Sequence, residues 1–253
     1  MTTVILFVLG AIVGSFLNVA AFRFRSGLSV GGRSRCGSCG KTLSWYELVP
    51  VVSFIVLGGR CGSCRANISW RYPAVETLTA LIFATVYHPA HLLWVNALFL
   101  IIFSIYIVIL IYDMRHKVIP NSLVYPAILL ALVIAVLARG TLLDWLAGPI
   151  LFAFFTLIWL LSRGRAMGFG DGKLALSIGL MLGAAGGFSA VIVAFWVGAL
   201  YGLALIAAGF LSPLLTRGKR ITMKSEVPFA PFLVLGAWLS LILQLDLLHV
   251  AFH

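Results

Sequence analysis

Long runs of apolar residues, separated by short polar turns, follow one another along almost the whole chain. A helix that crosses a bilayer needs roughly 17–25 apolar residues, and a span buried among other helices can be shorter. Eight runs are candidates, at residues 4–22, 74–87, 92–112, 121–138, 142–162, 173–186, 188–211 and 229–247. The pattern therefore predicts an all-α polytopic membrane protein with about eight transmembrane helices.

The composition agrees with a bilayer and excludes an ordinary soluble domain. Hydrophobic residues make up 62% of the chain, charged residues make up 10%, and the mean hydropathy is +1.12. Soluble domains carry about 25% charged residues. The net charge of +11 would suggest nucleic acid if it covered a soluble surface, so the placement of the basic residues decides what the charge means.

The basic residues orient the predicted helices. The first run has no basic residue before it, whereas Arg23 and Arg25 follow it, which is typical of an anchor with its N-terminus outside and not of a cleaved signal. With that topology Arg139 lies outside, and the other 17 of the 18 basic residues lie on the opposite side. Loops rich in Lys and Arg face the cytoplasm. The charge therefore indicates orientation, and we expect no nucleic-acid partner.

This topology divides the chain into three parts. Residues 1–22 form the first helix, residues 23–72 form the one sizeable extramembrane module, which is cytoplasmic, and residues 73–253 hold the other helices. Within the module, the apolar stretch 49–59 is too short to span a bilayer. We expect it to lie on the membrane surface, and a re-entrant position is the alternative.

All four cysteines fall in the module, in two Cys-Gly-Ser-Cys knuckles. Two such pairs about twenty residues apart match a four-thiolate zinc site, which predicts Cys36, Cys39, Cys61 and Cys64 as ligands. Disulfides are disfavoured in a reducing cytosol, and the βαβ pattern of a thioredoxin-like redox pair is missing around these residues. A site with four protein thiolates has no open position, so the zinc is expected to be structural.

The chain has only seven acidic residues, and most have a simple explanation. The acids expected to be solvated charges in loops or at helix ends are Glu47, Asp144, Glu226 and Asp246. Glu76 lies at the start of the second predicted helix, where it suits the positive helix N-terminus and is placed to pair with Arg71. An intramembrane acid is costly, so a functional role for Glu76 stays open.

Asp113 and Asp171 remain, at the cytoplasmic edge of two different predicted helices and at the same depth. Two carboxylates brought together in a low-dielectric setting share one proton and titrate as a pair. In an aspartic protease the ionised member takes a proton from water while the protonated member polarises the scissile carbonyl. The alternative is that Asp171 only caps a helix and Lys173 faces lipid headgroups.

Glycines surround Asp171 in the stretch "GFGDGK". We expect Gly168, Gly170 and Gly172 to adopt positive φ and to allow close approach of another chain. An extended substrate could then hydrogen-bond along this edge. The pattern predicts Gly168, Gly170 and Lys173 as substrate-binding residues.

Several motifs, in this order along the chain, resemble those of the type IV prepilin peptidases, which are membrane aspartic proteases of the GxGD type. They are "GSFLNV" (14–19), the two cysteine knuckles, "ISWRYPAVETLTA" (68–80), Asp113 with "VIPN" after it, and "GFGDGKLAL" (168–176). The resemblance implies that Asp113 and Asp171 are the catalytic pair. It also implies a prepilin or pseudopilin substrate, whose short basic leader is cut at the cytoplasmic face of the bacterial inner membrane.

Members of this family often methylate the new N-terminal amine with S-adenosylmethionine, an activity associated with the N-terminal part and its cysteine module. Two features depart from the family pattern. The chain has Ile119-Pro120-Asn121 where the family commonly has Ile-Pro-Asp. It has "FRFRSG" after the first helix where the family often has Arg-x-Pro. No S-adenosylmethionine pocket can be recognised in the sequence, so a peptidase without methyl transfer stays open. From the residues alone, an ion-coupled transporter and a zinc-anchored scaffold stay open too.

Overall fold

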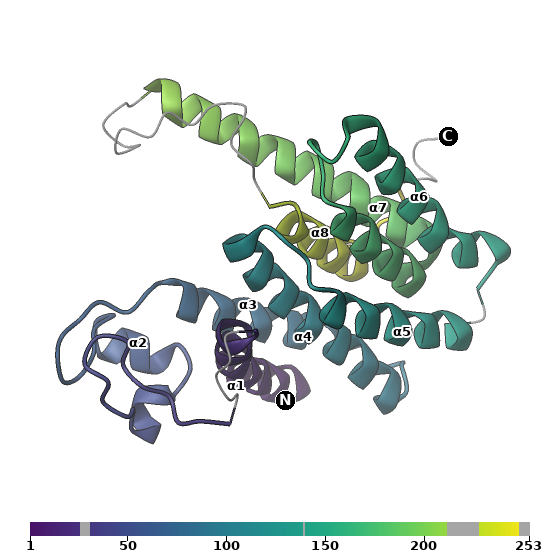
Figure 1. The fold of residues 1–253 in the computed structure, drawn as a ribbon. Coiled ribbons are helices and arrows are strands. Elements are labelled where there is room, and N and C mark those ends of the chain that lie inside the picture. Colours follow the sequence, from purple (N-terminus) through teal and green to yellow (C-terminus); the bar gives the residue numbers. More distant parts are fainter. Residues whose placement is uncertain (26–30, 139, 212–227, 248–253) are drawn as a thin grey trace. The chain divides into compact units, whose positions relative to one another are not determined.

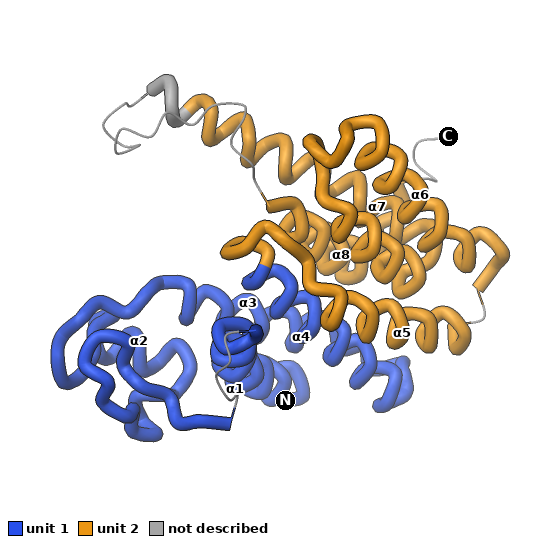
Figure 2. Tube along the Cα trace, in the orientation of Figure 1, with its two compact units in different colours: residues 1–112 blue, residues 113–253 orange. Residues whose placement is uncertain are grey.

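The computed structural model describes residues 1–25, 31–138, 140–211 and 228–247. Every regular element in these ranges is a helix (Figure 1). The strand-like pairing within them is limited to two isolated bridges, Arg35 with Thr42 and Arg60 with Asn67. The all-α prediction is thus confirmed. The chain forms two compact units, residues 1–112 and 113–253 (Figure 2).

The first unit holds the cysteine module and the helices around it. Its elements are α1 (Thr2–Arg23), the 3₁₀ helix η1 (Trp45–Leu48), the short α2 (Val52–Val56), α3 (Arg71–Val86) and most of α4 (Leu93–His116). The predicted spans 4–22 and 74–87 correspond to α1 and α3, each within three residues of its observed ends. η1 and α2 lie between the two knuckles along the chain.

α1 and α3 pack against each other in antiparallel directions. A Cβ atom at Gly14 would lie 2.8 Å from the hydroxyl of Thr79, so only glycine allows this approach. Towards the end of α1, the Asn18 side-chain amide donates to the carbonyl of Tyr72 at the start of α3, at 3.2 Å. The cysteine module connects these two ends, so it begins and ends at one end of the α1–α3 pair.

The second unit begins in the last turn of α4 and is built around one long element. Its other helices are α5 (Asn121–Ala138), α6 (Leu142–Ser162), α7 (Phe169–Leu211) and α8 (Ala230–Leu243). α7 packs on α5, α6 and α8. Glycines let α6 and α7 meet closely, since a Cβ at Gly179 would lie 2.7 Å from the Cα of Gly148.

α7 is two helices that meet at Gly183, whose φ of +70° and ψ of −167° are not helical. In a straight helix, residues 179 and 187 would lie about 12 Å apart along the axis, yet a Cβ at Gly187 would lie 3.0 Å from the Cα of Gly179. The chain therefore folds back at Gly183. The predicted division of this region into two helices is present, but it falls at Gly183, the glycine with left-handed φ, and not at residue 187 between the predicted runs 173–186 and 188–211.

The fold-back is held by Asp144, near the start of α6. Its Oδ1 atom accepts a hydrogen bond from the N–H of Ala184 at 2.9 Å, and its Oδ2 atom accepts from the N–H of Thr141 at 2.8 Å. One carboxylate therefore caps the starts of two helices, which leave unpaired N–H groups at their N-termini. Asp144 is partly exposed at a helix end, as predicted, but its two backbone partners were not predicted.

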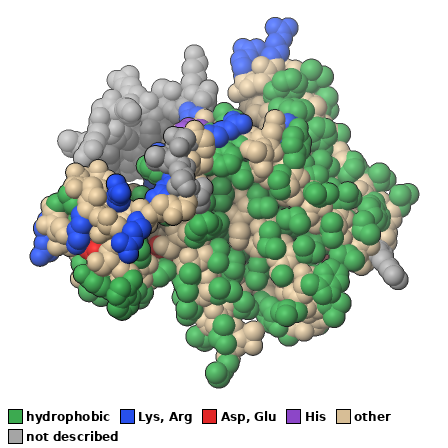
Figure 3. All heavy atoms as spheres, turned by 60° about the horizontal axis from the view of Figure 1, so that its bottom comes forward, with side chains coloured by type: hydrophobic (Ala, Val, Ile, Leu, Met, Phe, Trp, Pro, Cys, Tyr) green, Lys and Arg blue, Asp and Glu red, His purple; other side chains and the backbone are tan. Residues whose placement is uncertain are grey.

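Five of the described helices are long and apolar enough to cross a membrane, by length and composition: α1, α4, α5, α6 and α7. α3 and α8 are shorter, with 16 and 14 residues. Hydrophobic side chains cover most of the face shown in Figure 3, where Lys and Arg side chains gather in a few places. These features fit a multi-pass membrane protein.

Candidate active site and metal centre

Asp113 lies in the last turn of α4, which continues beyond the predicted end at residue 112 to His116. The helix ends at Lys117, whose φ is +53° and whose N–H donates to the carbonyl of Asp113 at 2.7 Å. The aspartate is 4% exposed. Its Oδ2 atom accepts a hydrogen bond from the N–H of Ala230, the first residue of α8, at 3.3 Å. A buried carboxylate thus joins the end of one helix to the start of another.

Asp171 lies in the first turn of α7 and is 7% exposed. Its Oδ2 atom accepts from the N–H of Gly168 at 3.1 Å, and its own N–H donates to the Gly168 carbonyl at 3.1 Å. Asp171 therefore does close the start of α7, as the alternative explanation of the sequence proposed. This capping contact does not exclude a catalytic role, because it uses only one of the two carboxylate oxygens. A carboxylate that served only as a cap would also be expected to be exposed to solvent, whereas Asp171 is buried.

The glycines around Asp171 do not act as the sequence predicted. Gly168, Gly170 and Gly172 are not among the glycines with positive φ, and residues 169–172 are helical, so the expected strand-like edge is not formed. The physical reason for Gly170 is close packing, since a Cβ there would lie 2.8 Å from the Cβ of Ile119. The predicted substrate-binding role of Gly168 and Gly170 stays a prediction.

The two aspartates belong to the same compact unit, and Asp113 is among the groups whose charge bears on the carboxyl group of Asp171. Both carboxylates are buried, and each accepts a backbone N–H through its Oδ2 atom. Two interacting acids in such a setting hold protons jointly. The arrangement can supply a general base and a general acid at one place.

Lys173 lies one residue beyond Gly172 and reaches α5. Its Nζ atom donates to the Asn121 side-chain oxygen at 2.7 Å and to the Tyr125 hydroxyl at 3.3 Å. The ammonium also lies 5.0 Å from the centre of the Phe169 ring, within the range of a cation–π contact. The lysine thus links the starts of α5 and α7, and its predicted contact with substrate stays a prediction.

The two cysteine knuckles come together in the first unit. The four sulfur atoms all lie within 4.8 Å of one another, and the Sγ atoms of Cys36 and Cys64 are 3.8 Å apart. A tetrahedral zinc ion with Zn–S bonds of about 2.3 Å requires sulfur separations of about 3.8 Å. The four predicted ligands are therefore in an arrangement that could hold one metal ion.

Each knuckle points backbone N–H groups at its first cysteine. The N–H groups of Cys39 and Ser38 lower the pKa of the Cys36 thiol to about 6. The same contacts, from Cys64 and Ser63, lower the pKa of the Cys61 thiol. Such donors stabilise a thiolate, which is the form that binds a metal.

The two knuckles are parts of an internal repeat that the sequence analysis missed. Residues 35–45, "RCGSCGKTLSW", and 60–70, "RCGSCRANISW", are identical at seven of eleven positions. Their backbones correspond as well: the N–H of Cys36 donates to the Lys41 carbonyl and that of Cys61 to the Ala66 carbonyl, both at 2.9 Å. Aligning the chain with itself at an offset of 25 residues would have revealed it.

Two acids of the first unit also have partners that were not predicted. Glu47 accepts from the N–H of Ser44 at 2.8 Å and pairs with Lys41 at 3.6 Å, and its side chain is only 4% exposed, so the prediction of a solvated charge is wrong. Glu76 is buried and accepts from the N–H of Val51 at 2.8 Å. It thus ties α3 to the residue before α2.

Two family models match this chain, one in its N-terminal part and one in the part that follows. The model of the bacterial peptidase A24 N-terminal domain matches residues 8–90, and that of the type IV leader peptidase family matches residues 98–203. The prepilin leader peptidase/N-methyltransferase of Bacillus subtilis (strain 168) is 32% identical over 244 residues, which cover 93% of this chain and 92% of that protein. The chain belongs to the type IV leader peptidase family.

Other members of the type IV leader peptidase family are similarly close. The prepilin leader peptidase/N-methyltransferase of Pseudomonas aeruginosa is 30% identical over 265 residues, which cover 92% of this chain and 88% of that protein. The one from Myxococcus xanthus is 34% identical over 218 residues, covering 83% of this chain but 65% of that protein. No solved structure matches the chain. The peptidase family match, residues 98–203, includes both Asp113 and Asp171.

Proposed function

We propose that this protein is a membrane aspartic peptidase. It removes the short basic leader from type IV prepilins or pseudopilins at the cytoplasmic face of the bacterial inner membrane, and then methylates the new N-terminal amine. Membership of the type IV leader peptidase family supports the peptidase, and the names of the Bacillus and Pseudomonas relatives support the methyl transfer. The orientation rests on the distribution of Lys and Arg between the two sides.

The observation that carries the peptidase assignment is the pair of buried carboxylates. Asp113 and Asp171 are 4% and 7% exposed and interact electrostatically. A transporter with two acidic ion ligands is a weaker explanation, because transport sites usually lie near the bilayer midplane. Here the acids lie in the last turn of α4 and the first turn of α7, at helix ends.

In the proposed reaction one carboxylate is ionised and the other is protonated. The ionised carboxylate takes a proton from a water molecule, whose oxygen attacks the scissile carbonyl carbon, while the protonated carboxyl group donates to the carbonyl oxygen. The tetrahedral intermediate collapses when its C–N bond breaks. The leaving nitrogen takes the proton that the first carboxylate removed from water, and the proton on the former carbonyl oxygen returns to the second carboxylate. The hydrogen bonds from Ala230 and Gly168 hold one oxygen of each carboxylate in place.

The methyl donor would be S-adenosylmethionine, which supplies an electrophilic methyl group to the amine. The larger of the two described cavities does not fit it. That cavity has no carboxylate in its lining to hold ribose hydroxyls, and it lies in a basic module, whereas the donor carries a net positive charge. We therefore assign no residue to the donor.

We propose zinc as the metal held by Cys36, Cys39, Cys61 and Cys64. The sulfur separations support this choice, as does the preference of zinc for four thiolates in structural sites. With all four positions filled by protein, the ion would hold the module together and take no part in peptide cleavage.

The proposal is tested with purified protein in detergent, a prepilin-like substrate, and intact mass as the measure of cleavage. Asp113→Asn and Asp171→Asn should each lower the cleavage rate by about 10²–10⁴-fold, because each removes a proton-transfer group. Adding S-adenosylmethionine should increase the product mass by one methyl group. Asp246→Asn, which changes an exposed acid of the same unit, should leave the rate unchanged.

The pH dependence gives a second test of a shared proton. The wild-type rate should fall on both sides of an optimum, because the reaction needs one ionised and one protonated carboxylate. A flat profile between about pH 5 and pH 9 would contradict this. Full cleavage by a folded Asp171→Asn variant, with unchanged thermal unfolding, would overturn the assignment of the pair.

A further inference from the structure

An open cavity of about 640 Å³ lies in the cysteine module, next to the second knuckle. We call it the module groove; its lining residues are Phe54, Ile55, Gly58, Gly59, Arg60, Asn67, Ile68 and Trp70. Gly58 and Gly59 both have positive φ and make the turn at its base. A Cβ at Gly59 would come within 3.0 Å of the Phe54 ring, so glycine here keeps the turn close to the aromatic wall.

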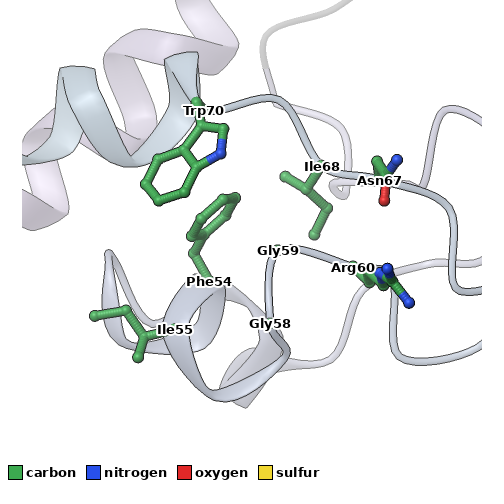
Figure 4. A pocket seen from close by; sticks show the side chains of 8 residues that line it. All are labelled: Phe54, Ile55, Gly58, Gly59, Arg60, Asn67, Ile68 and Trp70. Atoms are coloured by element: carbon green, nitrogen blue, oxygen red, sulfur yellow. The ribbon is translucent and has the colours of Figure 1, made fainter.

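The module groove has an apolar end and a polar end (Figure 4). The rings of Phe54 and Trp70 meet edge to face, with centroids 4.7 Å apart, and Ile55 lies further along the same helix as Phe54. Arg60 and Asn67 lie together at the other side, where a backbone bridge joins them. A ligand that fills this groove should therefore be amphipathic, with a hydrocarbon part against the rings and a polar group against the guanidinium.

Charge selects the sign of that polar group. Between residues 31 and 71 the sequence has six basic residues and one acid, Glu47, and Glu47 already pairs with Lys41. Among the described residues no carboxylate pairs with Arg60. An anionic headgroup is attracted by such a surface, whereas a basic leader peptide or the cationic methyl donor is repelled.

The place of the groove in the first unit is that of a membrane interface. Trp70 immediately precedes α3, which packs antiparallel to α1, a helix able to cross a bilayer. Trp70 and Ile55 are 76% and 70% exposed, which is unfavourable for large apolar side chains in water. Tryptophan at the end of a membrane helix typically lies at the level of the headgroups, where lipid can cover both side chains.

We propose that the module groove binds one anionic phospholipid, with its phosphate on Arg60 and its acyl chain against Phe54, Ile55 and Trp70. The occupant is a lipid of the surrounding leaflet and not a free phosphate ion, because most of the lining is apolar. By this contact the zinc-binding module is held on the membrane surface.

The internal repeat supplies matched controls for a test. Arg35 and Trp45 are the repeat equivalents of Arg60 and Trp70, but neither lines the groove. Native mass spectrometry of the full-length protein in detergent would measure retention of added phosphatidylglycerol and phosphatidylcholine. Arg60→Gln should weaken phosphatidylglycerol binding about fivefold to tenfold, since one Lys or Arg contact is worth about 1 kcal/mol at an anionic surface. Trp70→Ala should weaken both lipids, and Arg35→Gln and Trp45→Ala should weaken neither.

Equal weakening by Arg35→Gln and Arg60→Gln would mean a diffuse basic surface and would overturn the proposal. Displacement of the lipid by excess inorganic phosphate would mean an anion site, and displacement by S-adenosylhomocysteine would mean a donor site, and either would overturn it. Zinc content and thermal unfolding show whether each variant is folded. If Trp70→Ala fails to fold, Arg60→Gln alone decides the outcome. Cleavage is measured separately, so the failure of this proposal is distinguishable from that of the peptidase assignment.

Discussion

At the scale of single residues, one polar contact joins the starts of two helices beside the aspartate pair. Lys173 on α7 donates to the Asn121 side chain on α5 at 2.7 Å. Asn121 stands where the Ile-Pro-Asp pattern of the type IV prepilin peptidases has the aspartate. Lys173 therefore donates to a neutral amide oxygen where an aspartate would offer a charged carboxylate oxygen. The 2.7 Å distance suits either acceptor.

Asn121→Asp should therefore replace the neutral hydrogen bond with an ion pair without harming the enzyme. Exposed ion pairs contribute about 0–1 kcal/mol, so the thermal unfolding temperature should stay the same or rise slightly, and the cleavage rate should not fall. Lys173→Met removes the hydrogen bonds to Asn121 and Tyr125 and should lower the free energy of unfolding by about 1 kcal/mol. A tenfold loss of cleavage in Asn121→Asp would instead indicate that Asn121 itself contacts substrate.

The aspartate pair could be predicted because acids are rare in this chain and both stand at the edges of apolar runs. The capping boxes Ser44-x-x-Glu47 and Thr141-x-x-Asp144 were readable in the sequence as well. The second contact of Asp144 was not, since it depends on how the chain turns back. Asp144 bonds Ala184, forty residues away, and no local pattern signals such a contact. The knuckle repeat, in contrast, was readable in the sequence and was missed.

At the scale of elements, the reversal within α7 depends on the backbone conformation of one residue. Gly183 has a φ of +70°, a region that is strained for residues with a side chain. A Cβ there would also lie 2.7 Å from the Asp144 oxygen that caps the second half of α7. A side chain at residue 183 would therefore strain the backbone and displace the Asp144 cap at the same time.

Gly183→Ala should destabilise the protein by about 1–3 kcal/mol through backbone strain, measured as a lower thermal unfolding temperature in detergent. Gly202→Ala is the matched control in the same helix, because a Cβ at that position meets nothing within 4 Å. It should be neutral or should stabilise by up to about 1 kcal/mol. Similar unfolding temperatures for the two variants would show that α7 tolerates a side chain at its bend.

Apolar runs predicted the helices well because lipid leaves the backbone no alternative to helical hydrogen bonding. The ranges 121–138 and 142–162 match α5 and α6 at both ends. The errors arose where a helix ends in polar residues, as at Asp113 in α4, and where two helices meet without a polar turn, as at Gly183. Hydrophobic pattern alone does not mark either kind of boundary.

At the scale of the whole molecule, the cysteine cluster and the aspartate pair belong to different compact units. The four cysteines lie in residues 1–112, whereas Asp113, Asp171, Ala230 and Gly168 all lie in residues 113–253. The division into units falls inside α4, so it differs from the sequence-based domain boundaries at residues 22 and 72, which stay a prediction. Each unit contains the groups that its own proposed role requires.

Removing the metal should therefore spare peptide cleavage. The double variant Cys39→Ser with Cys64→Ser takes one ligand from each knuckle and should lower the zinc content from about one ion per chain to near zero, measured by elemental mass spectrometry. Cleavage should persist, because the aspartates and their hydrogen-bond donors lie in the other unit. Ser38→Ala, in the same knuckle but not a ligand, should keep its zinc. Loss of cleavage in a folded zinc-free variant would show that the module positions the active site.

The near identity of the two knuckles also matters for how chains meet one another. Each knuckle contributes two cysteines in the same sequence context, so a knuckle of one chain can complete the metal site of a second chain with the same ligand geometry. Exchange of equivalent segments is a low-cost route to dimers. Loading the proposed zinc before chains are crowded together in a membrane would therefore favour a site closed within one chain over a site shared between two.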